Sequence, residues 1–120
     1  VSAFVDAESA QIEAASTCGF TVCEIHTGKY AEAVINNDFA LDHEVCSARN
    51  RICEAVGQVN EIGMQCNAGH GLTHRNVGGI ASIKGIGELH IGHSIISRSV
   101  IIGIRNSVEE MKQCMKDASP

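Results

Sequence analysis

The segment MQCNAGHG, Met64–Gly71, carries the pattern from which the fold is predicted. Its first four residues alternate between apolar and polar side chains, and this alternation is typical of a β-strand with one buried face. A glycine stands on each side of His70, and glycine allows backbone conformations that other residues avoid. The segment therefore predicts a strand over residues 64–69, followed by a loop that presents His70.

Three other segments show the same alternation and are predicted to be strands: residues 1–6, 20–27 and 88–93. Helical patterns separate them. An Ala-rich helix is expected from about Glu8 to Cys18, and Gly19 is a natural stop for it. After the second strand we expect a loop as far as Asp38, which would cap a long amphipathic helix that Gly63 ends.

The last third of the chain predicts three further helices. A short one is expected over Val77–Ile83, and another from about Ser94. The last is expected to begin at Ser107, because the sequence Ser-Val-Glu-Glu matches a capping box with Glu110 at its third helical position.

Strands that alternate with helices pair in parallel through right-handed crossovers. We therefore predict an α/β fold of the (β/α) TIM-barrel type, here about half a barrel of four βα units, forming a single domain over residues 1–120. A closed barrel of this type usually needs about 250 residues. Four strands leave two open edges, so we expect a partner: the missing N-terminal half-barrel, or another copy of the chain in a homo-oligomer.

Each predicted strand has one apolar face, which suits packing against helices, and one largely polar face. A purely structural barrel interior is filled by bulky branched side chains instead. Buried polar groups need protein partners, water or a ligand. The pattern therefore favours a ligand site at the strand ends.

Composition excludes several classes of function. The net charge is −5 with no basic run, and aromatic residues make up only 3% of the chain, which argues against nucleic-acid binding. The longest apolar run, Val100–Ile104, is too short to cross a membrane.

The six cysteines form no CxxC pair, so we expect reduced, buried thiols in a cytoplasmic protein, with a disulfide as the open alternative. Because the chain begins at Val1 in strand-like sequence, we expect it to be a piece of a longer protein.

His70 is the first candidate functional residue. It follows a predicted strand, where barrel enzymes place their chemistry, and histidine moves protons near neutral pH. The alternative is an ordinary loop histidine. His74 lies four residues later, but no HExxH, HxH or CxxC motif occurs, and we predict no metal site.

Glu24 lies on the polar face of its strand, as does His26. A carboxylate in a largely enclosed pocket can act as a base or stabilise a cationic intermediate, although an ion pair with a lysine or arginine is the alternative. Gly92 and His93 stand between the fourth strand and a helix. A helix N-terminus there would attract phosphate, although such a glycine can also serve only the turn.

Four blocks of the chain together resemble the second half of the pyridoxine 5′-phosphate synthase family. They are VSAFVDAESAQIEAA, CEIHTGKYAEA, NAGHGLTHRNV and GELHIGHSIISRSV, in the order and at close to the spacing of that family. The resemblance covers nearly all 120 residues.

The resemblance implies a (β/α)8 barrel enzyme of vitamin B6 biosynthesis that tends to form homo-oligomers. It would condense two phosphorylated small-molecule substrates, 3-amino-2-oxopropyl phosphate and 1-deoxy-D-xylulose 5-phosphate, to pyridoxine 5′-phosphate, phosphate and water without a metal or organic cofactor. Glu24 would stabilise the transition state, and His70 would be the proton donor. Gly71, Gly92 and His93 would hold substrate or product, largely through phosphate.

The chain also departs from the family. The family's N-terminal blocks, Asp-His and His-x-Arg, and its further glutamate base are not present, and His90 stands where the family usually has asparagine. Gly78 and Gly79 replace better helix formers, and Lys84 replaces a common proline. Two alternatives to an enzyme therefore stay open: a phosphate-ligand-binding half-barrel without turnover, and a half-barrel that self-assembles through its open edges.

Overall fold

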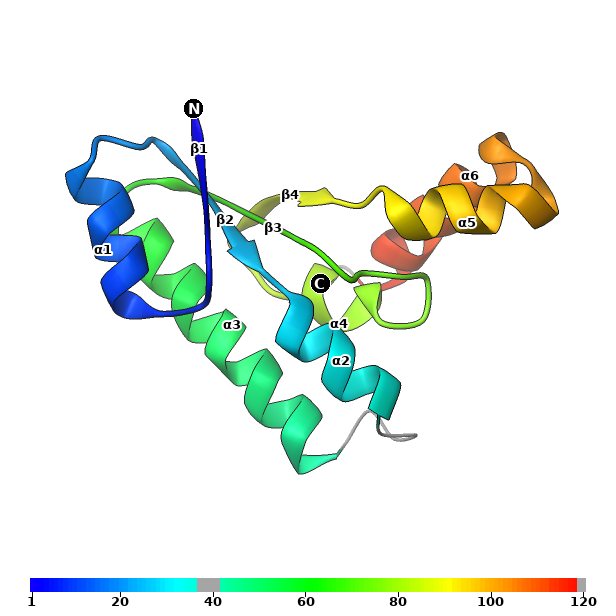
Figure 1. Ribbon diagram of the computed structural model, residues 1–120, viewed down its shortest axis with the longest axis horizontal. Coiled ribbons are helices and arrows are strands. Elements are labelled where there is room, and N and C mark those ends of the chain that lie inside the picture. The colour runs from blue at the N-terminus through cyan, green and yellow to red at the C-terminus, as the bar shows by residue number, and fades with distance from the viewer. Residues whose placement is uncertain (37–41, 119–120) are drawn as a thin grey trace.

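The computed structural model describes residues 1–36 and 42–118, which form four strands and six helices in alternation along most of the chain (Figure 1). The strands are β1 (Ser2–Val5), β2 (Val22–His26), β3 (Gln65–Gly69) and β4 (Ile86–His90). The helices are α1 (Ser9–Thr17), α2 (Gly28–Asn36), α3 (His43–Ile62), α4 (Val77–Ala81), α5 (His93–Ile102) and α6 (Ile104–Ala118).

The four strands form one parallel sheet in the order β1-β2-β3-β4. Neighbours in the sheet are also neighbours in the sequence, so each crossover advances the sheet by one strand, as it does in a barrel. The register places Cys23 beside Cys66 and Glu24 beside Asn67. This arrangement confirms the prediction of a parallel α/β fold of half-barrel type.

The core lies between the sheet and the helices that cover one of its faces. Cys23 and Ile25 of β2 are fully buried, and so is Ile12 of α1. Val56 and Val59 of α3 are equally buried, because the apolar residues of that helix recur at three- and four-residue steps. The helix ends at Gly63, as predicted, and the structure shows that the backbone there is left-handed.

The opposite face of the sheet bears the polar side chains that the alternation predicts. Glu24 and His26 of β2 point to this face, which is only partly covered, and Phe4 of β1 is 56% exposed there. In Figure 1 the helical hairpin of α5 and α6 extends beyond β4 instead of covering this face. The face that would line a closed barrel is therefore open.

Helix α2 corrects the sequence-based expectation of a loop after the second strand. Its buried residues are Gly28, Tyr30, Ala31 and Ala33, and three of these are too small to give a clear apolar stripe. The expected capping residue Asp38 lies outside the described residues. Asp42 precedes α3, and its side chain accepts a hydrogen bond of 2.8 Å from the backbone N–H of Glu44.

Two other predicted boundaries are wrong. Strand β4 begins and ends earlier than the predicted range 88–93. Helix α6 begins at Ile104, directly after Gly103, whose φ of 82° breaks the helical path. Ser107 is therefore inside the helix, and its hydroxyl donates to the carbonyl of Ile95 over 2.7 Å. Glu110 pairs with Arg98 instead of completing a capping box.

Helix α5 has no buried residue. Four apolar side chains on this helix and the residues after it are more than half exposed: Ile96, Val100, Ile101 and Ile104. Such a surface is unusual on a monomer, which agrees with the expectation that this half-barrel has a partner.

All six cysteines are free. Cys23 and Cys66 are buried as predicted, and burial raises the pKa of the Cys66 thiol to about 12. Cys18 is exposed, contrary to the prediction, because it follows the last turn of α1. Within residues 1–36 and 42–118, no helix is long and apolar enough to span a membrane.

Candidate functional site

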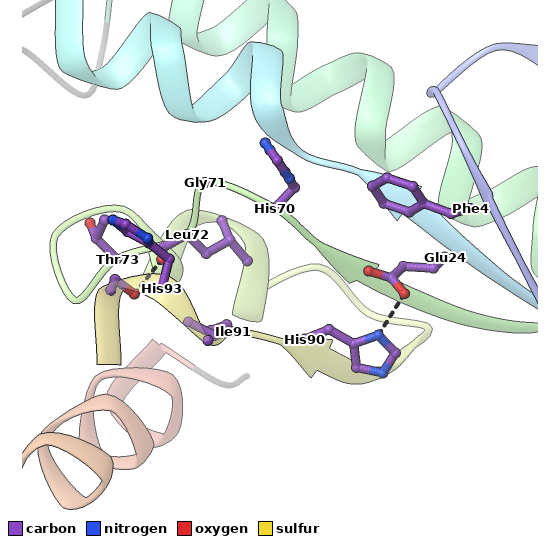
Figure 2. A pocket seen from close by; sticks show the side chains of 11 residues that line it. Phe4, Glu24, His70, Gly71, Leu72, Thr73, His90, Ile91 and His93 are labelled. Atoms are coloured by element: carbon purple, nitrogen blue, oxygen red, sulfur yellow. Dashed lines mark hydrogen bonds and ion pairs between the residues drawn. The ribbon is translucent and has the colours of Figure 1, made fainter. Parts of the chain in front are cut away.

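A pocket of about 570 Å³ lies at the carboxyl ends of the strands (Figure 2). All five residues singled out in the sequence line it: Glu24, His70, Gly71, Gly92 and His93. They come from β2, the loop after β3 and the start of α5. The parallel sheet brings them together because the carboxyl ends of its strands share one edge.

Glu24 reaches the pocket from β2 and pairs with a histidine. Its Oε2 lies 2.6 Å from Nδ1 of His90 on β4, two strands away (Figure 2). The Glu24 side chain is only 19% exposed. The partner of Glu24 is therefore the imidazole of His90, and not a lysine or arginine as in the alternative considered from the sequence.

Gly69 lies between Glu24 and His90 and has no space for a side chain. A Cβ atom at this position would lie 2.6 Å from Oε1 of Glu24 and 2.8 Å from the carbonyl oxygen of His90. The absence of a side chain at the end of β3 allows the two residues to meet across that strand.

The backbone at His70 is left-handed, with a φ of 84°. A non-glycine residue rarely adopts this conformation, which costs about 1–3 kcal/mol and is most frequent at functional sites. Gly71 continues the turn with a φ of 73°. The sequence predicted the loop but assigned its conformational freedom to the flanking glycines, whereas His70 itself carries the strain.

Buried hydrogen bonds hold the His70 loop in this conformation. Thr27 is fully buried, and its hydroxyl lies 2.7 Å from the carbonyl oxygen of Gly69 and 2.6 Å from that of His70. Asn76 is also buried, and its amide donates to the carbonyl of Gly71 over 3.2 Å. Neither residue was among the candidates singled out from the sequence, although Thr27 lies in the block CEIHTGKYAEA and Asn76 in NAGHGLTHRNV.

His70 also contacts a second histidine. The ring centroids of His70 and His26 are 4.6 Å apart, and Nδ1 of His26 lies 3.2 Å from Oδ1 of Asp6. Phe4 packs edge-on against His26 with centroids 5.2 Å apart. The side chain of His70 is thus supported by a neighbouring ring, which is itself oriented by a carboxylate.

The start of α5 forms the far wall of the pocket. Gly92 precedes the helix, and His93 is its first residue. Backbone N–H groups in the first turn of a helix have no partner within the helix and favour anions. The Ser94 hydroxyl donates to the carbonyl of Leu72 over 2.6 Å and so ties this helix to the His70 loop.

His74 is on the same loop but does not line the pocket. In the described part of the chain, no group of three His, Cys, Asp or Glu side chains has a geometry that could hold a metal ion. The residues that meet at the pocket are a carboxylate, histidines and backbone donors. This set can transfer protons and bind an anion such as phosphate.

A family model described as pyridoxal phosphate biosynthesis protein PdxJ matches residues 1–117. Among curated proteins named pyridoxine 5′-phosphate synthase, the chain is 50% identical over 116 residues to one from Gloeothece citriformis, which covers 97% of this chain and 46% of that protein. It is 48% identical over 118 residues to one from Coxiella burnetii, covering 98% of this chain and 47% of that protein. The chain spans about half the length of the curated relatives it matches.

Proposed function

This chain belongs to the family of pyridoxal phosphate biosynthesis protein PdxJ, and we propose that it forms the C-terminal half of the active site of a pyridoxine 5′-phosphate synthase. The proposed reaction condenses 3-amino-2-oxopropyl phosphate with 1-deoxy-D-xylulose 5-phosphate. The products are pyridoxine 5′-phosphate, phosphate and water.

One observation carries this proposal. Glu24, His70 and the first turn of α5 face one pocket although they lie far apart in the sequence. In the described part of the chain, the sheet ends at β1 on one edge and at β4 on the other, with no further strand paired to either. A further half-barrel would enclose the pocket, and the curated relatives are about twice as long as this chain.

His70 is the proposed proton donor. Ring closure requires carbonyl additions and dehydrations, and each dehydration needs a proton for the departing oxygen. The backbone at His70 is left-handed, and its imidazole contacts the ring of His26. Glu24 is the proposed stabiliser of the positive charge that develops on nitrogen-containing intermediates, since its carboxylate is mostly screened from water.

Gly71, Gly92 and His93 are proposed to bind the phosphate of a substrate or of the product. The first turn of α5 offers backbone N–H groups. Neither Gly92 nor Gly71 has a side chain that would keep a phosphate away from the main chain. We propose that the complete protein assembles as a homo-oligomer in the cytoplasm, and the exposed apolar side chains of α5 support the assembly.

The test is complementation. The chain is mixed with the N-terminal half of the Coxiella burnetii relative and both phosphorylated substrates, and pyridoxine 5′-phosphate is measured by chromatography. We expect product in the mixture and none from either half alone. A folded mixture that makes no product would exclude the enzymatic proposal.

Two variants separate catalysis from folding in this assay. His70→Asn removes the proposed proton donor, and His74→Asn makes the same change in the same loop outside the pocket. We expect product formation to fail only with His70→Asn. If the wild-type mixture binds pyridoxine 5′-phosphate by calorimetry but makes none, the chain belongs to a binding protein instead.

A further inference from the structure

His90 contacts two carboxylates through its two ring nitrogens. Nδ1 lies 2.6 Å from Oε2 of Glu24, and Nε2 lies 3.3 Å from Oε2 of Glu88. A carboxylate only accepts hydrogen bonds. Both contacts are therefore satisfied together only when the ring carries a proton on each nitrogen, which makes it a cation.

The surrounding residues fix this arrangement. Figure 2 shows Glu24 and His90 pointing toward each other at one wall of the pocket. β3 lies between them and contributes a neutral side chain, Asn67, whose amide donates to Glu88 over 3.4 Å. Oε1 of Glu24 occupies the space that a Cβ atom on Gly69 would fill, so Glu24 packs directly against the backbone of β3.

We propose that His90 is a positioning residue: it holds the Glu24 carboxylate toward the pocket, and its own protonation sets the charge that this wall presents to phosphorylated ligands. This inference rests on the proposed function, because it assumes that Glu24 acts on a substrate in the pocket. Neither the family match nor the resemblance assigns a role to a histidine at this position.

The charges at this wall explain the expected effect of pH. With His90 protonated, Glu24, His90 and Glu88 sum to one negative charge, and with His90 neutral they sum to two. The hydrogen bond to Glu24 is the largest influence and raises the pKa of His90. Burial opposes it, and the weaker hydrogen bond to Glu88 and the charges of both carboxylates raise the pKa further. The other titratable groups that line the pocket are His70 and His93. Anionic phosphate ligands should therefore bind more weakly once His90 loses its proton.

The first experiment measures the titration of His90 by NMR in the chain labelled at histidine. His90→Asn identifies the signal by removing it. We expect Glu24→Gln to lower the titration midpoint of His90, and Glu88→Gln to lower it less, since its contact is longer. An unchanged midpoint in Glu24→Gln would overturn the proposal.

The second experiment compares three side chains at position 90 in the complemented assay. Asparagine places a donor near the position of Nδ1 but does not titrate, glutamine places one near Nε2, and alanine has none. We expect Ala to lower product formation roughly tenfold, Gln nearly as much, and Asn least. The pH profile of product formation by His90→Asn should also lack the change that the titration of His90 causes in the wild type.

A third measurement does not depend on turnover. Calorimetry gives the affinity for pyridoxine 5′-phosphate across the pH range in the wild-type chain and in His90→Asn. The ratio of the two dissociation constants cancels the titration of the ligand itself. We expect this ratio to change through the His90 midpoint, and a constant ratio would overturn the electrostatic part of the proposal.

These outcomes separate the inference from the proposed function. If the wild-type mixture makes no product, the proposed function fails, and the NMR and calorimetry results alone decide whether His90 controls Glu24 and the charge of the wall. If the wild-type mixture makes product and His90→Ala matches it at every pH, the proposed function stands and the positioning role is refuted.

Discussion

The hydroxyl of Thr27 lies 2.6 Å from the backbone carbonyl oxygen of His70, 43 positions later in the chain. The same hydroxyl lies 2.7 Å from the carbonyl oxygen of Gly69. One buried proton is thus shared by two acceptors at the turn that presents His70. The end of β2 therefore determines where the candidate proton donor lies.

Thr27→Val tests this relationship, because valine has nearly the same shape and lacks the hydroxyl. We expect the free energy of unfolding to fall by about 1–3 kcal/mol, since the carbonyl of His70 loses its buried donor. Product formation in the complemented assay should fall further than stability alone explains. Urea unfolding and the assay measure the two effects.

Thr17→Val is the matched control. The Thr17 hydroxyl also donates to a backbone carbonyl, that of Glu13, but on the exposed surface of α1. We expect a change of less than about 0.5 kcal/mol there. Equal losses in the two variants would mean that the Thr27 hydroxyl has no special role.

Gly78 and Gly79 are adjacent in α4 but differ in their surroundings. A Cβ atom on Gly79 would overlap the hydroxyl of Tyr30, whereas one on Gly78 would lie 3.4 Å from the Cβ of Ala118. Tyr30 is buried and cannot easily move away, because its hydroxyl donates to the carbonyl of Asn76 over 2.9 Å. We expect Gly79→Ala to lower the free energy of unfolding by about 1–3 kcal/mol.

Gly78→Ala provides the comparison at the neighbouring position. Alanine favours a helix over glycine by up to about 1 kcal/mol, so this variant should be as stable as the wild type or more stable. Both values come from urea unfolding. The idea that Gly79 accommodates Tyr30 would be wrong if the two variants had the same stability.

The sheet could be predicted from the sequence because its signal is local. Apolar residues recur at about every second position of each strand, and this two-residue period can be recognised in a single sequence without an alignment. Helix α2 could not be predicted in this way, since its buried face consists mainly of glycine and alanine. The predicted start of α6 was wrong, because the Ser107 hydroxyl does not cap a helix as its local motif suggests but donates a tertiary hydrogen bond to the carbonyl of Ile95.

The sequence allowed the individual pocket residues to be predicted, but not the contacts between them. Glu24 was found because it lies on the polar face of its strand, and His70 and Gly92 were found because each follows a strand. The pair of Glu24 with His90 joins residues 66 positions apart on strands that are not adjacent. No spacing rule reports such a contact, because it depends on the register of three strands and on the missing side chain at Gly69.

The stability of the fold should depend on pH through His90. Its pKa in the folded chain is raised above the ordinary value of histidine, mainly by the hydrogen bond to Glu24, which outweighs the opposing effect of burial; the bond to Glu88 adds a smaller increase. A raised folded pKa stabilises the folded state at pH values below the unfolded pKa, and this contribution is lost as the pH rises through the folded pKa. We therefore expect His90→Asn to be less stable than the wild type in mild acid, with a smaller difference in alkaline solution.

Urea unfolding of both proteins at about pH 5.5 and about pH 9, on either side of the histidine range, measures this difference. Repeating the comparison in a Glu24→Gln background supplies the control, since the main partner is then uncharged. The difference between His and Asn should become nearly independent of pH in that background. A difference that is equally pH-dependent with and without Glu24 would point to another titrating group.

Because the backbone at His70 is left-handed, substitutions there can test separately the role of the imidazole in proton transfer and the effect of the backbone conformation on stability. Asparagine tolerates a φ of 84° better than other non-glycine residues, and β-branched residues tolerate it least. We expect His70→Asn to be as stable as the wild type, and His70→Val to lose about 1–3 kcal/mol. Both should fail to make product, because neither side chain can exchange a proton near neutral pH. A His70→Asn protein that keeps its stability and still makes product would remove His70 from the proposed mechanism, whereas loss of product at full stability would assign the proton transfer to its imidazole.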